Sequence, residues 1–249
     1  MAEDDTPNPF TRPGFIAGAV VVAALIVTAI ILTVLNLNRG SEATPPTPTP
    51  TSTASSGPTP SQTPSGPTDS TSICGLKGEK MAGTVSTAPD ATWQFQDVYA
   101  YPSSPVFGPG ETATEGYRYC FQHSPEGSLF AAANMTIALF GDVETRAALL
   151  DYALTDGTYR DALLSQVGET TGSDVRASIA GFRVLSYDGD TARVDVAFRA
   201  TTQGKVANGS AVFDLVWSEG DWKINSNIAE PFRLAQLPDT SGYVNWRQE

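Results

Sequence analysis

Few side chains in this 249-residue chain have the types and spacing that acid–base or nucleophilic chemistry requires. His123 is the only histidine, and it directly precedes Ser124, so a base beside a hydroxyl nucleophile is one interpretation. The same residues are typical of a helix start, with Ser124 as N-cap, Pro125 in the first turn and Glu126 after it. Since no third partner is recognisable from the spacing, we expect a capping or surface role for His123 and no catalysis here.

Two other sets of polar side chains invite a chemical interpretation. Asp188 and Asp190 flank a glycine, where a carboxylate pair could bind a hard cation, but aspartate is also typical of hairpin turns, and we expect the turn. Five side chains would be the polar lining of a pocket if the domain encloses one: Asp97, Tyr99, Tyr119, Tyr152 and Asp214. Spacing gives no geometry for this set, so we predict no catalytic residue, no metal site and no cofactor.

Composition excludes several classes of protein. The formal charge of −12, from 15 Lys and Arg against 27 Asp and Glu, argues against binding to nucleic acid or to an anionic membrane surface. One histidine and two cysteines exclude a zinc ribbon, an iron–sulfur cluster and a histidine-rich metal site.

The N-terminal third of the chain has the composition of an anchor and a spacer. Residues 15–35 are almost entirely apolar and, as a helix of about 31 Å, match the hydrocarbon core of a bilayer. We predict a cytoplasmic leader at 1–14, a transmembrane helix at 15–37 and a disordered spacer rich in Pro, Thr and Ser at 38–72. A cleaved signal peptide, with Ser41-Glu42-Ala43 as its cleavage site, is the alternative. In either case the rest of the chain is expected outside the cell membrane.

Residues 73–249 have the length and patterning of one α+β domain with a net charge of 13 − 22 = −9. After an irregular lead-in to about residue 121, helical patterns are expected at 125–140, 143–154 and 158–167. Period-two patterns then predict four strands, at 177–187, 192–200, 210–217 and 222–227. The expected fold is helices packed on one face of a curved four-stranded antiparallel sheet, with the tail from residue 230 along the outside.

Two pairs of residues in this domain are candidates for a specific role. Cys74 and Cys120 can form one disulfide in an oxidising compartment, and the alternatives are a lipid anchor at Cys74 or two free thiols. Trp217 and Trp222 bracket the last turn of the sheet, where they serve either as core packing or as a protein-binding hot spot.

The order of these elements carries a resemblance. Helices followed by long hairpins and a terminal VWSEGDWKI hairpin resemble the cystatin-like cone of nuclear-transport-factor-like domains. With the anchor and spacer, the architecture resembles the bitopic scaffold subunits of conjugative type IV secretion systems in Gram-positive bacteria. The stretch GYRYCFQHSPEGSLFAAANMTIALFGD, with Cys74-Gly75-Leu76 before it, is similar to uncharacterised actinobacterial membrane-anchored proteins of mobile elements, and this similarity covers most of residues 73–249.

These resemblances imply a non-enzymatic, membrane-anchored scaffold or assembly component of a conjugation-type secretion or cell-envelope complex. Its expected partners are the bilayer and proteins of that complex, or further copies of itself, and not nucleic acid. The alternative is an extracytoplasmic module that holds a lipid, a wall fragment or a peptide in its cone. A hollow apolar cone would favour that module, a filled cone would favour the scaffold, and a polar pocket with a perturbed acid would favour an enzyme.

Overall fold

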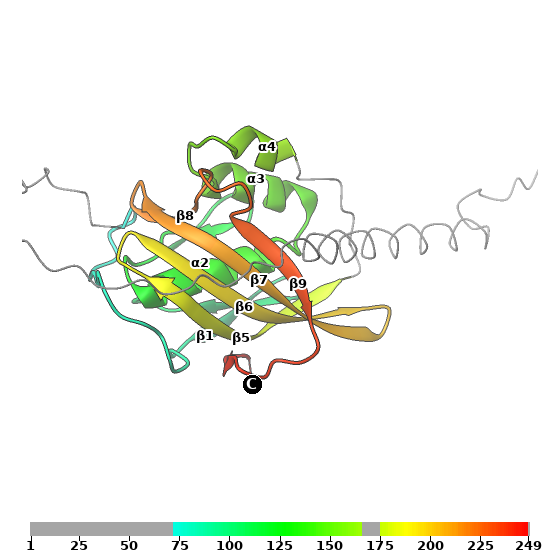
Figure 1. Ribbon diagram of the computed structural model, residues 1–249. Coiled ribbons are helices and arrows are strands. Elements are labelled where there is room, and N and C mark those ends of the chain that lie inside the picture. Colours follow the sequence, from blue (N-terminus) through cyan, green and yellow to red (C-terminus); the bar gives the residue numbers. More distant parts are fainter. Residues whose placement is uncertain (1–71, 166–174, 249) are drawn as a thin grey trace, which may run out of the picture. The chain divides into compact units, whose positions relative to one another are not determined.

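The computed structural model describes residues 72–165 and 175–248, all within one compact unit, Thr63–Glu249 (Figure 1). The predicted leader at 1–14, the transmembrane helix at 15–37 and all but the last residue of the spacer at 38–72 lie outside the described residues. The proposed domain at 73–249 is the part in which the fold can be followed.

The main element is an antiparallel sheet of six strands (Figure 1). Five strands are hydrogen-bonded in the order β10-β5-β6-β7-β8, and β9 pairs with β7. Their bounds are β5 (Arg176–Tyr187), β6 (Thr191–Thr202), β7 (Lys205–Ser218), β8 (Asp221–Ile224), β9 (Phe232–Leu237) and β10 (Val244–Asn245).

The expectation of helices packed on a four-stranded sheet is therefore wrong. The four expected strands are present as β5 to β8, but β7 has 14 residues and shares one edge between two partners. Residues 215–218 of β7 pair with β8, and residues 208–213 pair with β9. The tail from residue 230, expected along the outside, thus extends the sheet, because the long edge of β7 leaves backbone groups that it can satisfy.

The lead-in is also more regular than expected. It contains two antiparallel strand pairs, β1 with β2 and β3 with β4. Their bounds are β1 (Thr92–Gln96), β2 (Tyr99–Ser103), β3 (Glu111–Thr112) and β4 (Arg118–Tyr119). The described chain is therefore mostly β-structure, with few helices.

In the described part of the chain three helices precede the large sheet, and the first fills its inner side. They are α2 (Pro125–Ala138), α3 (Val143–Ala153) and α4 (Arg160–Ser165). Ser124 caps α2 as expected, its Oγ accepting a hydrogen bond from the amide of Gly127 at 2.9 Å. Every residue of α2 except Glu126 is buried, because strands β5 and β6 cover one side and the lead-in covers the other.

The core lies between α2 and the inner face of the sheet. In β6, Val194 and Val196 are fully buried at alternate positions, as the period-two pattern predicts. They pack in one apolar cluster with Leu129 and Phe130 of α2 and with Phe213 of β7. The inner face of the sheet is therefore closed by the chain's own helix.

Within residues 72–165 and 175–248, no helix has both the length and the apolar character needed to cross a membrane. The apolar helix α2 has 14 residues, about 21 Å at 1.5 Å per residue, against about 30 Å of hydrocarbon. On this finding the predicted single-pass architecture is corrected, together with the localisation derived from it.

Candidate functional site: the outer face of the sheet

The two faces of the large sheet carry different side chains. Paired residues on neighbouring strands share a face, so the register that points Val194 and Val196 inward points the intervening residues outward. We call this outward side of β5, β6, β7 and β9 the arginine face. Its charged side chains are Arg176, Arg183, Asp195, Arg193, Arg199, Asp214 and Arg233.

A buried carboxylate organises the middle of the arginine face. Asp195 is 2% exposed, and its Oδ2 accepts hydrogen bonds from Arg183 Nη2 at 2.5 Å and from the Tyr243 hydroxyl at 2.8 Å. Arg183 also lies over the Tyr243 ring, 4.2 Å from its centroid. The hydrogen bond to Asp195 raises the pKa of Arg183, so this arginine stays charged. Tyr243 is thereby held in one position against the sheet.

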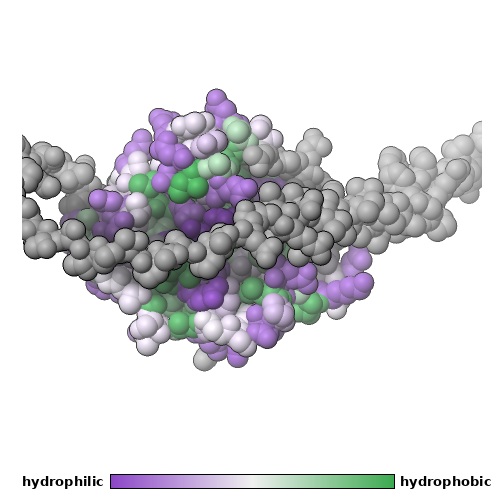
Figure 2. Space-filling model, viewed as in Figure 1, coloured by the Kyte–Doolittle hydropathy of each residue, from purple (hydrophilic) through white to green (hydrophobic). Residues whose placement is uncertain are grey.

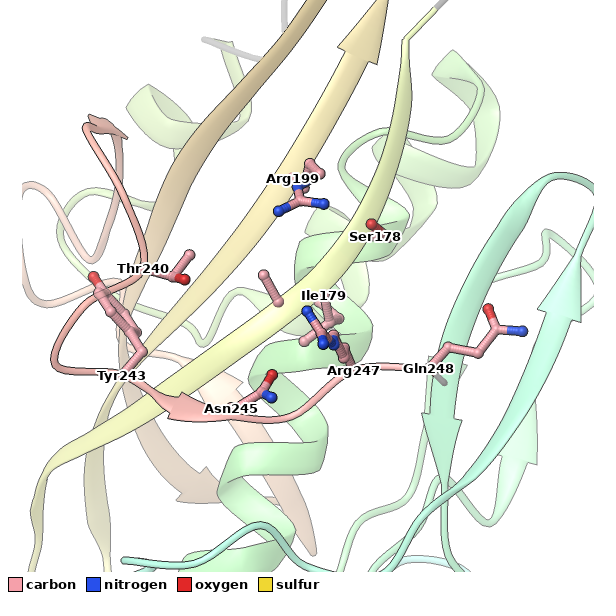
Figure 3. A pocket seen from close by; sticks show the side chains of 9 residues that line it. Ser178, Ile179, Arg199, Thr240, Tyr243, Asn245, Arg247 and Gln248 are labelled. Carbon is pink, nitrogen blue, oxygen red and sulfur yellow. The ribbon is translucent and has the colours of Figure 1, made fainter.

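Tyr243 forms one wall of an open polar groove of about 590 Å³ (Figure 3). Figure 3 shows the guanidinium groups of Arg199 and Arg247 over the ribbons of β5 and β6, with Thr240 and Tyr243 to one side and Gln248 to the other. Ser178 and Asn245 complete the polar lining. The groove therefore presents guanidinium, hydroxyl and amide donors together, a set that suits carboxylate or other anionic oxygens.

The arginines of this surface are incompletely neutralised. Asp214 lies between two of them, 3.5 Å from Arg193 Nε and 3.9 Å from Arg233 Nη2, which are long, surface-type contacts. Neither Arg199 nor Arg247 forms an ion pair with any described residue. With Arg247, six arginines face two aspartates, a local charge of 6 − 2 = +4 on a domain of net charge −9.

The tryptophans proposed as a hot spot have different environments. Trp222 is fully buried, and its Nε1 donates a hydrogen bond to the Gln122 carbonyl at 3.0 Å, so it offers no surface to a partner here. Trp217 is half-buried and stacks on His123, with ring centroids 4.1 Å apart and an interplanar angle of 2°. Only Trp217 of this pair meets solvent.

His123 has a structural environment rather than a catalytic one. It is 3% exposed, so it is not at the surface, and its Nε2 donates a hydrogen bond to the Gly189 carbonyl at 2.8 Å. Nδ1 lies 3.5 Å from Glu79 Oε1. Ser124 Oγ is occupied as the cap of α2. The histidine thus ties the lead-in to the β5–β6 turn.

The predicted carboxylate pair belongs to that same turn. Asp188 accepts hydrogen bonds from the amide of Thr191 at 2.7 Å and from its hydroxyl at 2.8 Å, and these bonds lower the pKa of Asp188. This is the turn role expected from the sequence. Among residues 72–165 and 175–248, no three His, Cys, Asp or Glu side chains group closely enough to hold a metal ion.

The five polar side chains proposed for a pocket do not come together. Tyr119 and Tyr152 have ring centroids 5.3 Å apart, whereas Tyr99 donates hydrogen bonds to the carbonyls of Phe140 and Val175 at 2.7 and 2.9 Å. Asp214 lies on the arginine face, and Asp97 occupies the β1–β2 turn with a φ of 53°. The set is therefore dispersed over the domain.

The buried carboxylate beside Tyr152 is Asp221, which the sequence analysis missed. Asp221 is 1% exposed and accepts hydrogen bonds from the Tyr152 hydroxyl at 2.7 Å and from the amides of Cys120 and Phe121 at 2.8 and 2.9 Å. Burial raises the pKa of Asp221, and these donors oppose the rise. Asp221 follows Glu219-Gly220, the position of an ordinary turn aspartate, so the turn explained it fully. The neighbouring Trp222 was the one local signal that this position is buried.

Lys223 lies on the other side of the same tyrosine. Its Nζ donates a hydrogen bond to the Tyr152 carbonyl at 2.8 Å and lies 3.1 Å from the ring centroid. Burial lowers the pKa of Lys223 to about 8. A second polar groove of about 240 Å³ runs past Lys223, Arg160 and Glu219. Asp221 and Lys223 thus stabilise the junction of α3 and β8 through one tyrosine.

The cysteine pair is joined as expected. Cys74 and Cys120 form a disulfide with their Cα atoms 5.9 Å apart. Gly110 lies against it, and a Cβ at that position would come 2.4 Å from Cys74 Sγ. The disulfide ties the start of the described chain to the residues just before α2.

A comparison with protein families matches residues 44–245, more than half of the chain, to the family described as Domain of unknown function (DUF8175). Neither a curated protein nor a solved structure matches the chain. The matched span includes the disulfide, α2 and all six strands of the large sheet. On the extent of that match, the chain belongs to the DUF8175 family.

Proposed function

We propose that the protein is a non-enzymatic scaffold or assembly component that docks an acidic partner protein on its arginine face. The observation that carries this proposal is the segregation of charge. Six arginines and two aspartates gather on one side of the sheet, while the domain as a whole has 22 acidic and 13 basic residues. A positive surface on an acidic domain attracts acidic partners, whereas the rest of the domain repels them, so a partner docks in one orientation.

The packing of α2 supports a scaffold over a module that holds a ligand in its cone. Thirteen of the 14 residues of α2 are buried against the inner face of the sheet, where such a ligand would have to lie. The two grooves at Arg199 and Lys223 are instead polar and open to the surface. This arrangement favours recognition on the outside of the sheet.

The chemistry of the arginine face suits protein carboxylates. Arginine presents a planar fork that binds a carboxylate through two parallel hydrogen bonds, and because the fork is rigid, little side-chain entropy is lost per hydrogen bond. Arg183 and Tyr243 are already fixed by Asp195, so part of the surface is organised before a partner binds. The resemblance to secretion scaffolds makes subunits of a conjugation-type or envelope complex the first partners to test.

The experiment is crosslinking of the full-length chain in its own cells, followed by mapping of the crosslinked residues. Wild type is compared with Arg199→Glu and with Lys77→Glu, an exposed position outside the arginine face that changes the charge by the same amount. We expect crosslinks from β5, β6 and β9 to acidic segments of one partner, lost in Arg199→Glu and kept in Lys77→Glu. Crosslinks confined to other surfaces, or equal loss in both variants, would refute the proposal.

A further inference from the structure

We infer that a second copy of this chain is a partner of the arginine face, and that copies associate head to tail through the acidic side of α3 and α4. The inference rests on the proposed docking role of the arginine face and adds the identity of what docks there. It follows from the distribution of charge over the domain and from the symmetry that this distribution permits.

The counterpart surface lies at the helical end of the same domain. Residues 142–161, which comprise α3, the following loop and the start of α4, carry five exposed carboxylates and two half-buried arginines, a local charge of 2 − 5 = −3. We call it the acidic helical face, and its carboxylates are Asp142, Glu144, Asp151, Asp156 and Asp161. In Figure 1 α3 and α4 lie together above the β8 and β9 edge of the sheet, and Figure 2 shows hydrophilic side chains among apolar ones at the top of the domain.

The acidic helical face is little neutralised from within. Arg160 donates hydrogen bonds to the side chain and carbonyl of Asp151, both at 2.8 Å, and Arg146 donates one to the Leu139 carbonyl at 3.3 Å, so both arginines of this face are already engaged. Glu144, Asp156 and Asp161 form no ion pair with any described residue. The carboxylates of one copy therefore match in chemistry the unpaired guanidinium groups of Arg199 and Arg247 in another.

Symmetry decides how two copies can use these surfaces. An isologous dimer whose two-fold axis passes through either patch would bring a charge of +4 against +4 or −3 against −3. A heterologous contact, arginine face to acidic helical face, brings opposite charges together. Such a contact leaves one face of each kind free, so it continues into a ring or a filament, as an assembly component requires.

The interaction is electrostatic and must respond to salt. Between about 50 mM and about 500 mM NaCl the Debye length falls from about 14 Å to about 4 Å, which screens contacts between exposed charges. We therefore expect the full-length chain to form oligomers at the lower salt concentration and monomers at the higher one, measured by sedimentation velocity.

Two double variants test the orientation of the contact. Arg176→Glu with Arg199→Glu takes the arginine face from +4 to 4 − 4 = 0 and keeps the acidic helical face. Glu144→Lys with Asp156→Lys takes the acidic helical face from −3 to 4 − 3 = +1 and keeps the arginine face. Each variant alone is expected to be monomeric at about 50 mM NaCl. Mixed in equal amounts, they retain one intact surface each and are expected to form a 1:1 dimer that cannot grow further. Lys77→Glu is the control that should still form oligomers, and far-ultraviolet circular dichroism confirms that all variants are folded.

Three results would overturn the inference: a monomeric wild type at the lower salt concentration, oligomers that persist at the higher one, or a mixture that stays monomeric. Failure here is distinguishable from failure of the proposed function. A monomeric wild type whose arginine face still crosslinks to another acidic protein refutes self-association alone. Absence of any crosslink at the arginine face refutes both.

Discussion

Replacing Asp221 by alanine tests how strongly one buried carboxylate joins three parts of the domain. From the start of β8 it accepts hydrogen bonds from the amides of Cys120 and Phe121, just before α2, and from the Tyr152 hydroxyl of α3. Each buried donor left without an acceptor costs about 1–3 kcal/mol. The two amides lie beside fully buried side chains, whereas half-buried Tyr152 can reach water, so we expect a loss of about 3–5 kcal/mol.

The assay is urea unfolding of the oxidised full-length chain, followed by tryptophan fluorescence. Asp214→Ala is the matched control, because it removes a carboxylate with ion-pair distances of 3.5 and 3.9 Å at the surface and should cost less than about 1 kcal/mol. Tyr152→Phe should cost about 1 kcal/mol, and its effect should shrink in the background of Asp221→Ala because both remove the same hydrogen bond. If Asp221→Ala and Asp214→Ala unfold at the same urea concentration, the Asp221 carboxylate does not hold β8, α3 and the residues before α2 together.

Two further predictions concern stability. Lys223 has a pKa of about 8 in the folded chain and about 10.5 in the unfolded chain. Between these values the unfolded state binds more protons, so the contribution of Lys223 to the free energy of unfolding increases as pH rises from 8 to 10. In Lys223→Met this increase, measured as the midpoint of urea unfolding at each pH, should be absent. A pH dependence equal to that of wild type would contradict the prediction. Cys74→Ser should lower the free energy of unfolding by about 2–4 kcal/mol under oxidising conditions. The difference from wild type should vanish in reductant, and its persistence would show that the serine itself is harmful.

Local sequence patterns predicted the elements that have one face in the core and the other in solvent, or a side chain with a specific capping role. The alternation from Ala192 to Ala200 identified β6, because one face of that strand is apolar core and the other is charged. Ser124 identified the start of α2 through the chemistry of its side chain. By contrast, β9 has only six residues, exposed at four consecutive positions, so its sequence gives little periodicity and its formation depends on the edge of β7.

Long-range features were beyond such patterns. Arg176 and Arg247 are 71 positions apart, and only the register of β5 with β6 and the return of the C-terminal segment bring the arginines together. The net charge of the chain gave no sign of this positive surface, because a sum over all residues does not say where the charges lie. The all-round burial of α2 was accessible in principle, because no charged residue follows Glu126 in the helix.

The burial of α2 also sets a demand on biosynthesis. The ribosome completes α2 at residue 138 and the last covering strand of its main core, β7, at residue 218, an interval of 218 − 138 = 80 residues. At about 5–20 residues per second, that interval lasts roughly 4–16 s. For those seconds a helix without a polar side lacks the complete sheet that it packs against, so we expect the nascent chain to bind a chaperone that recognises apolar helices.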